Sequence, residues 1–222
     1  MSYSDTTSEP RWRRRPEERP RQLIEAALEV FGEHGLAGAR LEDIAKRAGV
    51  SKGTIYLYFP NKEALFREMV RQKVIEEIEA AEQRLATGTP TEQLQRFMHG
   101  YWTFLRSPAF GTIYRLVHGE LHHFPDLAQF YSREVIQRGI KLVAEIVRRG
   151  AATGEFRTVD PTVAARMLGS IMVSHAVWCS RRTFFTHVAD ETDEQCIDAI
   201  IDFYLHALRA DPSVFDAGTS RT

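Results

Sequence analysis

Groups that recognise nucleic acid gather in one short stretch of the chain. They comprise a cation, a hydroxyl group and two phenols, with a glycine among them: Lys52, Gly53, Thr54, Tyr56 and Tyr58. Cations and hydroxyl groups bind phosphate oxygens, and side chains on a helix reach base edges in the major groove of DNA. The glycine would let the backbone come close to a duplex. The chemistry predicted here is therefore recognition of double-stranded DNA.

The residues around this stretch predict two short helices joined by a tight turn. Apolar residues recur at helical spacing in the first helix: Leu41, Ile44, Ala45 and Ala48. Gly49 stands where that helix ends, because a residue without Cβ adopts positive φ at no steric cost. Ser51 is a good N-cap for the second helix, residues 52 to about 58. This is the helix-turn-helix pattern, whose second helix lies in the major groove.

A helix as short as 52–58 is not stable alone, so neighbouring helices must hold it. The sequence predicts one before it, over 21–35, and one after it, starting at the N-cap Asn61 and running to about residue 86. Lys62 stands in the first turn of the later helix, where a cation is unfavourable for the helix dipole. Its presence there indicates an anionic partner, and helix N-termini suit phosphate.

The run SKGTIYLYFPNKEALF, and more broadly residues 21–66, resembles the DNA-binding domain of the TetR family of bacterial transcriptional regulators. The resemblance implies a regulator, most simply a repressor, that binds a near-palindromic operator as a homodimer and is released by a small molecule. It also implies that Lys62 contacts the DNA backbone. The chain departs from the family pattern at Ala39 and Arg40, where Thr or Ser is usual. We expect Arg40 to meet a phosphate instead.

The expected fold class is all-α, with about nine helices. It comprises an N-terminal three-helix helix-turn-helix DNA-binding domain and a larger C-terminal helical domain for ligand binding and dimerisation. The expected boundaries are a disordered basic arm over 1–19, the DNA-binding domain over 20–62 and the larger domain over 63–222. Four arginines surround Trp12 in the arm, from Arg11 to Arg15. They form either a solvated tail or an arm that follows DNA.

Composition agrees with a globular protein and excludes a membrane span. The chain has 222 residues, of which 43% are hydrophobic and 27% charged, and its net charge is −1. Residues 1–62 hold 11 Lys/Arg and 9 Asp/Glu, so DNA binding must rest on local placement of charge. No run of 18 apolar residues and no apolar signal segment occurs, so we expect a cytoplasmic protein.

The last two predicted helices, near 161–180 and 193–210, carry little polar surface. A helix that is apolar nearly all round must be buried, in its own domain or against another copy. In the family that the chain resembles, these helices pair across a dimer. We therefore expect a homodimer that forms through these helices. The dimer would place its two DNA-binding domains on neighbouring half-sites.

Aromatic residues in the larger domain suit a mostly apolar ligand site, although aromatics at helical spacing also build cores. The candidate ligand-binding residues are Trp102, Tyr114, His118, His122, Phe130, Tyr131 and Trp178. Cys179 and Cys196 have no metal-ligand spacing and are either two buried thiols or a redox pair.

His118 and His122 lie four residues apart, on one face of a predicted helix, and this spacing can hold a metal. The sequence places no convincing third ligand, so no metal site and no cofactor are predicted. No phosphate-binding glycine loop, nucleophile elbow or acid–base pair occurs, so no catalytic residue is predicted and the protein is not expected to be an enzyme. Two alternatives stay open: a helical adaptor that does not bind DNA, and a metal-binding hydrolase that uses His118 and His122.

Overall fold

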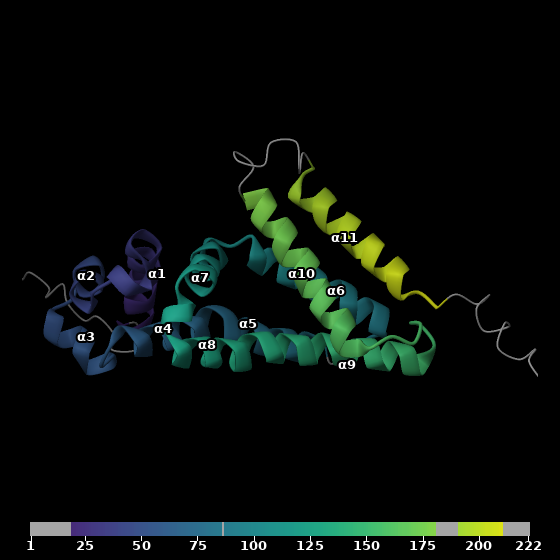
Figure 1. Ribbon diagram of the computed structural model, residues 1–222, viewed down its shortest axis with the longest axis horizontal. Helices are drawn as coiled ribbons and strands as arrows, with labels where there is room; N and C mark the ends of the chain where they lie inside the picture. Colours follow the sequence, from purple (N-terminus) through teal and green to yellow (C-terminus); the bar gives the residue numbers. More distant parts are fainter. Residues whose placement is uncertain (1–18, 86, 181–190, 211–222) are drawn as a thin grey trace, which may run out of the picture. The chain divides into compact units, whose positions relative to one another are not determined.

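The computed structural model describes residues 19–85, 87–180 and 191–210. These residues form helices joined by short turns (Figure 1), and within them β-pairing is limited to one isolated bridge between Phe156 and Arg209. The chain divides into two compact units, Met1–Met69 and Val70–Thr222. The Arg11–Arg15 arm and the aromatic residues Phe184 and Phe185 lie outside the described residues.

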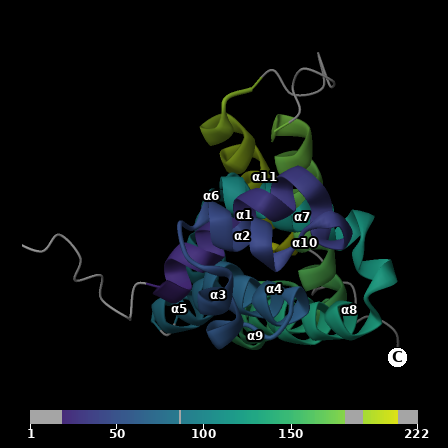
Figure 2. The same ribbon diagram turned by 90° about the vertical axis from the view of Figure 1, so that its left-hand side faces the viewer.

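The N-terminal unit contains four helices: α1 (Arg19–Gly38), α2 (Leu41–Arg47), α3 (Lys52–Tyr58) and the first part of α4 (Lys62–Val70). Figure 2 turns this unit toward the viewer and shows α2 and α3 as two consecutive short helices. The core forms between α1 and α4, where the Phe31 and Phe66 rings meet edge to face with centroids 6.4 Å apart. Ile44 of α2 and Ile55 of α3 are fully buried. Buried apolar residues of each short helix, three on α2 and one on α3, thus hold it against the unit.

Gly35 changes the direction of the chain inside α1. Its φ of 73° and ψ of 172° are not helical, so the helix that the sequence predicts over 21–35 ends here, and a further turn follows to Gly38. Positive φ is open to glycine because it has no Cβ. Leu36, the next residue, is fully buried and starts the path toward α2.

The C-terminal unit contains the remaining helices: η2 (Arg71–Ile75), α5 (Glu76–Arg84), α6 (Pro90–Leu105), α7 (Pro108–Gly119), η3 (Leu121–His123), α8 (Pro125–Tyr131), η4 (Ser132–Gln137), α9 (Arg138–Thr153), α10 (Pro161–Ser180) and α11 (Asp193–Leu208). Its core joins α6, α9, α10 and α11. The long helices α10 and α11 lie side by side (Figure 1 and Figure 2).

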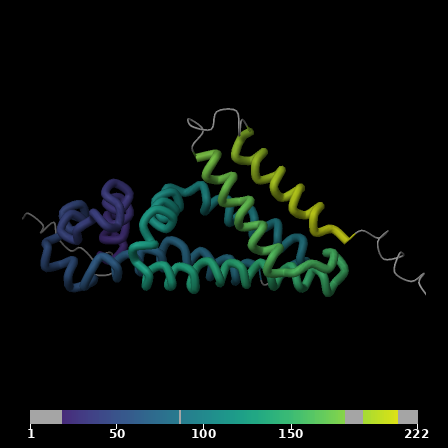
Figure 3. Tube along the Cα trace, in the orientation of Figure 1, coloured from purple at the N-terminus to yellow at the C-terminus, as the bar shows by residue number. Residues whose placement is uncertain are grey.

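Two long helical runs of the structure contain a π-helical segment that the sequence did not indicate. The chain runs without interruption from α4 through η2 to α5, and from α8 through η4 to α9, as the trace in Figure 3 shows. With each of these runs taken as one helix, the described residues form nine helices apart from the short 3₁₀ turn η3. An apolar pattern alone does not separate i→i+4 from i→i+5 hydrogen bonding, which is why these segments escaped prediction.

Polar contacts hold the helices of the C-terminal unit in register. The Arg138 guanidinium on α9 pairs with Glu79 at 3.1 Å and Glu82 at 2.8 Å on α5. The Arg106 guanidinium, just after α6, pairs with Asp193 at 2.9 Å and donates to the Ala176 carbonyl at 3.2 Å. None of the described helices is long and apolar enough to cross a membrane.

Candidate nucleic-acid interface

The start of α3 is capped as its sequence predicts. The Ser51 Oγ accepts a hydrogen bond from the Thr54 backbone N–H at 3.1 Å and lies 2.8 Å from the Thr54 Oγ1. This cap satisfies one of the free N–H groups at the helix start. The cap also engages the Thr54 hydroxyl, which the sequence predicts to contact DNA.

The turn between α2 and α3 closes with the hydrogen bonds of a Schellman motif. The Val50 N–H donates to the Ala45 carbonyl at 2.9 Å, and the Gly49 N–H donates to the Lys46 carbonyl at 3.1 Å. Gly49 has a φ of 66°, which confirms the predicted left-handed position. The turn therefore sets the angle between the two helices from local sequence alone.

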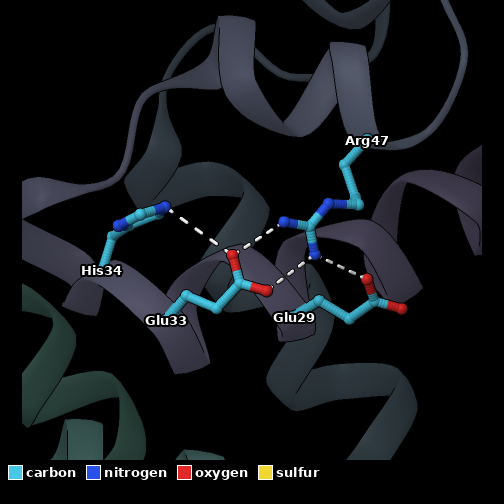
Figure 4. Close-up of polar contacts among 4 residues, drawn as sticks. All are labelled: Glu29, Glu33, His34 and Arg47. Carbon is cyan, nitrogen blue, oxygen red and sulfur yellow. Dashed lines mark hydrogen bonds and ion pairs between the residues drawn. The ribbon is translucent and has the colours of Figure 1, made fainter.

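Helix α2 is fastened to α1 at its C-terminal end (Figure 4). The Arg47 guanidinium lies 2.8 Å from the Glu29 carboxylate and 2.7 Å from the Glu33 carboxylate, while His34 lies 3.7 Å from Glu33. The hydrogen bond from Arg47 lowers the pKa of Glu33, and the two carboxylates raise the pKa of Arg47. At its other end α2 begins after Arg40, whose side chain is exposed and makes no cap hydrogen bond. The capping role of the usual Thr or Ser is thus lost here, as the sequence indicated.

Glu42 of α2 joins two of the predicted DNA-binding residues. Its carboxylate lies 2.8 Å from the Lys52 Nζ and accepts a hydrogen bond from the Tyr56 hydroxyl at 3.2 Å. The Lys52 ammonium also lies 5.9 Å from the centre of the Tyr56 ring. The hydrogen bond from Lys52 is the main cause that lowers the pKa of the Glu42 carboxyl from 4.5 to about 2. Glu42 was not among the predicted site residues, because its position on α2 shows no pattern that points to α3.

The outer surface of α3 is unusually rich in exposed large side chains. Tyr56 is 45% exposed, Tyr58 39% and Leu57 85%. A Cβ added at Gly53 would meet only the Ser51 Oγ, at 3.8 Å, so nothing in the protein itself requires glycine there. Sequence reasoning placed the two tyrosines and Gly53 on this face but missed Leu57, since an apolar residue on a short helix looks like part of the core.

Lys62 has a partner that the sequence analysis did not foresee. Its Nζ donates to the Ala37 carbonyl at 2.7 Å and lies 3.5 Å from the Ala39 carbonyl, at the end of α1. The C-terminal end of a helix carries partial negative charge, so the protein itself supplies the expected anionic partner. Asn61 caps α4 as predicted, with its Oδ1 accepting from the Ala64 N–H at 2.8 Å.

The predicted ligand-binding residues fall into different environments. Trp102 and Phe130 are buried, and the Trp102 Nε1 has no hydrogen-bond partner among the described residues. The exposed His118 ring stacks on Tyr114 with centroids 4.0 Å apart. These two rings end a row of neighbouring aromatic rings along α6 and α7: Phe97, Tyr101, Phe104, Phe110, Tyr114 and His118.

Two half-buried tyrosines stand out within the same unit. Burial raises the pKa of Tyr131 on α8 to about 12. Burial, together with the nearby Tyr131, also raises the pKa of Tyr101 on α6. The sequence singled out Tyr131 but counted Tyr101 with the apolar stripe of its helix. Trp178 of α10, a further predicted ligand residue, is partly exposed and lies beside His175.

The predicted single helical face for His118 and His122 is wrong. Helix α7 ends at Gly119, and His122 lies in the following 3₁₀ turn, exposed and with its ring 3.8 Å from that of His123. The described residues contain no group of three or more histidine, cysteine or acidic side chains arranged to hold a metal ion. Cys179 and Cys196 are both buried, and their Sγ atoms lie 3.5 Å apart.

Comparison with known proteins extends these observations to most of the chain. Residues 23–69 match the bacterial regulatory proteins of the tetR family, and residues 92–210 match the C-terminal domain of AefR-like transcriptional repressors. The fatty acid metabolism regulator protein of Bacillus subtilis is 30% identical over 163 residues, which cover 71% of this chain and 81% of that protein.

Solved structures share the fold. The transcriptional regulator FadR from Bacillus subtilis, in complex with stearoyl-CoA, has a TM-score of 0.71 at 23% identity and covers 85% of this chain and 99% of its own. A transcriptional regulator from Saccharomonospora viridis, in complex with choline, has a TM-score of 0.72 at 22% identity, with 88% and 100% covered. A capped helix-turn-helix followed by a matching C-terminal domain leads to one conclusion: the chain belongs to the TetR family of bacterial transcriptional regulators and is a DNA-binding regulator.

Proposed function

We propose that this regulator is a homodimeric repressor that reads a near-palindromic operator with α3 and is released by a largely apolar effector. The observation that carries the proposal is the outer face of α3, where Lys52, Tyr56 and Leu57 are exposed. A major groove offers phosphates, base edges and methyl groups to such side chains. Arg40, Thr54, Tyr58 and Lys62 are proposed as further DNA contacts. Because its target is DNA, we place the protein in the cytoplasm.

The first experiment tests DNA binding. Purified protein selects duplexes from random DNA, and the Kd for the selected operator is measured over a range of salt. We expect Kd to rise steeply with salt, and Lys52→Ala to lower the slope of log Kd against log salt by about one for each protomer. Lys141→Ala, which removes an exposed lysine of α9, is the matched control and should change neither quantity. Loss of all retention on DNA would favour the helical adaptor.

Exposed apolar side chains on α10 and α11 support the homodimer. Met167 is 59% exposed and Phe203 64% exposed. On α10, exposed residues recur at helical spacing and include two serines, which permit close approach: Met167, Ser170, Ser174 and Trp178. A twofold interface on these helices would cover this surface and set two copies of α3 on half-sites about 34 to 36 Å apart, or a multiple of that.

The effector is proposed to bind among the helices of the C-terminal unit. The half-buried tyrosines Tyr101 and Tyr131 and the unpartnered Trp102 Nε1 supply hydrogen-bond donors in apolar surroundings. A buried donor without an acceptor costs about 1–3 kcal/mol, so a ligand carbonyl at Trp102 would be favoured. Since the FadR structure holds stearoyl-CoA, a long-chain acyl thioester is the effector class that we propose.

A release assay tests the effector class. Labelled operator bound to the protein is titrated with stearoyl-CoA, acetyl-CoA, free CoA and choline. We expect release by stearoyl-CoA alone, because only it carries a long apolar chain. Release by choline, or by CoA without an acyl chain, would contradict this assignment.

Release would act through the helical run that begins with Lys62 in α4 and ends with Arg84 in α5. This run belongs to both units, so a change in its tilt would alter the separation of the two copies of α3 in a dimer. An effector shifts this equilibrium by no more than its difference in affinity for the two states.

A further inference from the structure

Leu57 is the most outward-facing large apolar residue on α3, and this position has a geometric cause. Successive residues of a helix are rotated by about 100°, so residues two before and two after a given position lie on the opposite side. Ile55 is fully buried. Gly53 and Leu57 are its neighbours at minus two and plus two, and they therefore share one stripe that points away from the core.

The two residues of this stripe complement each other. A Cβ at Gly53 would meet only the Ser51 Oγ, at 3.8 Å, so the absence of a side chain leaves the helix backbone exposed on the outer face. Leu57, one turn later on the same stripe, is 85% exposed. A surface that approaches α3 would meet bare backbone first and the leucine beside it.

The surroundings of Leu57 specify what that surface is. Lys52 at the start of α3 and Arg40 just before α2 are both exposed and carry positive charge. An isolated exposed leucine needs no explanation, but this one lies between two exposed tyrosines on a seven-residue helix that begins with an exposed lysine. Cations around an apolar centre match the major groove, where phosphates flank base edges and thymine alone carries a methyl group.

We propose that Leu57 contacts the C5-methyl group of a thymine in each operator half-site, so that base discrimination at this point is apolar. The inference rests on the proposed function, since it assumes that α3 enters the major groove. It adds a specificity-determining residue to the polar contacts. Because a leucine side chain forms no hydrogen bond, the base that it selects must offer an apolar group, here the methyl group, in the major groove.

Deoxyuridine provides the test, because it lacks only the methyl group and keeps every pairing and groove hydrogen bond of thymine. Each thymine of the selected operator is replaced in turn, symmetrically in both half-sites, and the Kd is measured at one salt concentration. We expect one position at which the replacement weakens binding by the wild-type protein roughly fourfold per half-site, the factor for one buried methyl group. With Leu57→Ala the same replacement should change Kd by less than about twofold.

Two controls separate the possible failures. Leu57→Ala should unfold at the wild-type temperature, since the side chain is exposed, and Ile136→Ala, at another exposed apolar residue, should keep the wild-type response to deoxyuridine. An equal response of wild type and Leu57→Ala at every position, or no response at any, would overturn the proposal while DNA binding stands. Failure of the wild-type protein to bind any duplex would overturn the proposed function as well. The binding measurement on the wild-type protein alone reveals this outcome, before any variant is made.

Discussion

Glu42 holds two of the side chains that are proposed to contact DNA, Lys52 and Tyr56. Its carboxylate binds the Lys52 ammonium and the Tyr56 hydroxyl, which positions both in the free protein. It also places a negative charge beside the phosphates that Lys52 would meet. Glu42 therefore opposes binding to any duplex through its charge while it orients two contacts that depend on groove geometry.

We predict that Glu42→Gln tightens binding to unrelated duplex DNA roughly fivefold, because it removes one negative charge that repels the phosphates. The gain for operator should be smaller, because Lys52 and Tyr56 lose their orientation. Fluorescence anisotropy with operator and scrambled duplex measures both. Glu145→Gln is the matched control, since Glu145 is an exposed carboxylate of α9 that also pairs with a basic residue, Arg148.

The pH dependence of this effect follows from the lowered pKa. Because the Glu42 carboxyl titrates at about 2 when folded and at 4.5 otherwise, its pairing is present above pH 4.5 and is lost only as pH falls toward 2. The ratio of Kd values for wild type and Glu42→Gln should thus stay constant from about pH 5.5 to pH 8. A ratio that changes across this range would contradict the assignment to Glu42.

Gly53 shows a conflict between stability and function. We predict that Gly53→Ala stabilises the free protein by about 0.5–1 kcal/mol, since alanine is a better helix former and its Cβ meets no close neighbour. The same methyl group should weaken operator binding by at least about tenfold, or 1.4 kcal/mol, because it separates the α3 backbone from the groove. Thermal unfolding and anisotropy measure the two effects.

Gly100→Ala is the control for this prediction. Gly100 is an exposed residue of α6 with open space at its Cβ position, so the substitution should stabilise the protein without changing its affinity for DNA. Unchanged operator affinity in Gly53→Ala would show that the backbone does not approach the duplex there.

At the scale of an element, the end of α9 depends on one glycine. The Phe156 N–H donates to the Gly150 carbonyl at 3.0 Å, and the buried Phe156 ring lies where a Cβ of residue 150 would be. The ring thus packs directly on the helix backbone and closes the core beneath the turn that leads to α10. Overpacking at such a site forces the ring or the helix to move.

We predict that Gly150→Ala destabilises the protein by about 1–3 kcal/mol. Gly139→Ala, in the first turn of the same helix but with open space at its Cβ position, should instead stabilise it slightly. Thermal unfolding followed by circular dichroism distinguishes the two variants. A Gly150→Ala protein as stable as wild type would mean that Phe156 can leave its place at no cost.

At the scale of the whole molecule, α10 and α11 have two tasks. Their inner faces complete the core of the C-terminal unit, where Tyr204 donates to the Ala164 carbonyl at 2.7 Å and Leu168 and Met172 are buried. Their outer faces expose Met167 and Phe203, and this is where the proposed dimer would form. The same two helices would therefore belong to the core of one subunit and also set the distance between the two DNA-binding domains of the dimer.

We predict that Phe203→Asp shifts the protein from dimer to monomer, because a charge in a buried apolar interface would lack a partner. Light scattering after size-exclusion chromatography measures the mass, and operator affinity should fall with it, since each half-site would be bound separately. Ile136→Asp, at a residue 48% exposed in η4, is the control and should stay dimeric. A dimeric Phe203→Asp protein would place the interface elsewhere.

The sequence by itself determined the elements whose signals are local. Ser51 and Gly49 mark the start of α3 and the turn before it, and α3 and α10 have the predicted bounds, because a cap, a left-handed glycine or a proline acts on neighbours within a few residues. The motif around α3 also led to the right family. The site was predicted only in part, since periodicity tells which side of a short helix faces outward but not what lies next to it.

Only the tertiary structure decided which residues meet across the fold. The Lys62 ammonium binds carbonyl groups at the end of α1, and Glu42 joins Lys52 to Tyr56. Each contact joins elements that are separated along the chain, and it forms only after the core has fixed their distance and direction. The break of α7 at Gly119, which separates His118 from His122, likewise depends on how the chain turns into the core at the buried Leu121. Local sequence patterns indicate the chemistry available to a side chain, whereas the packing of the helices determines which residues it contacts.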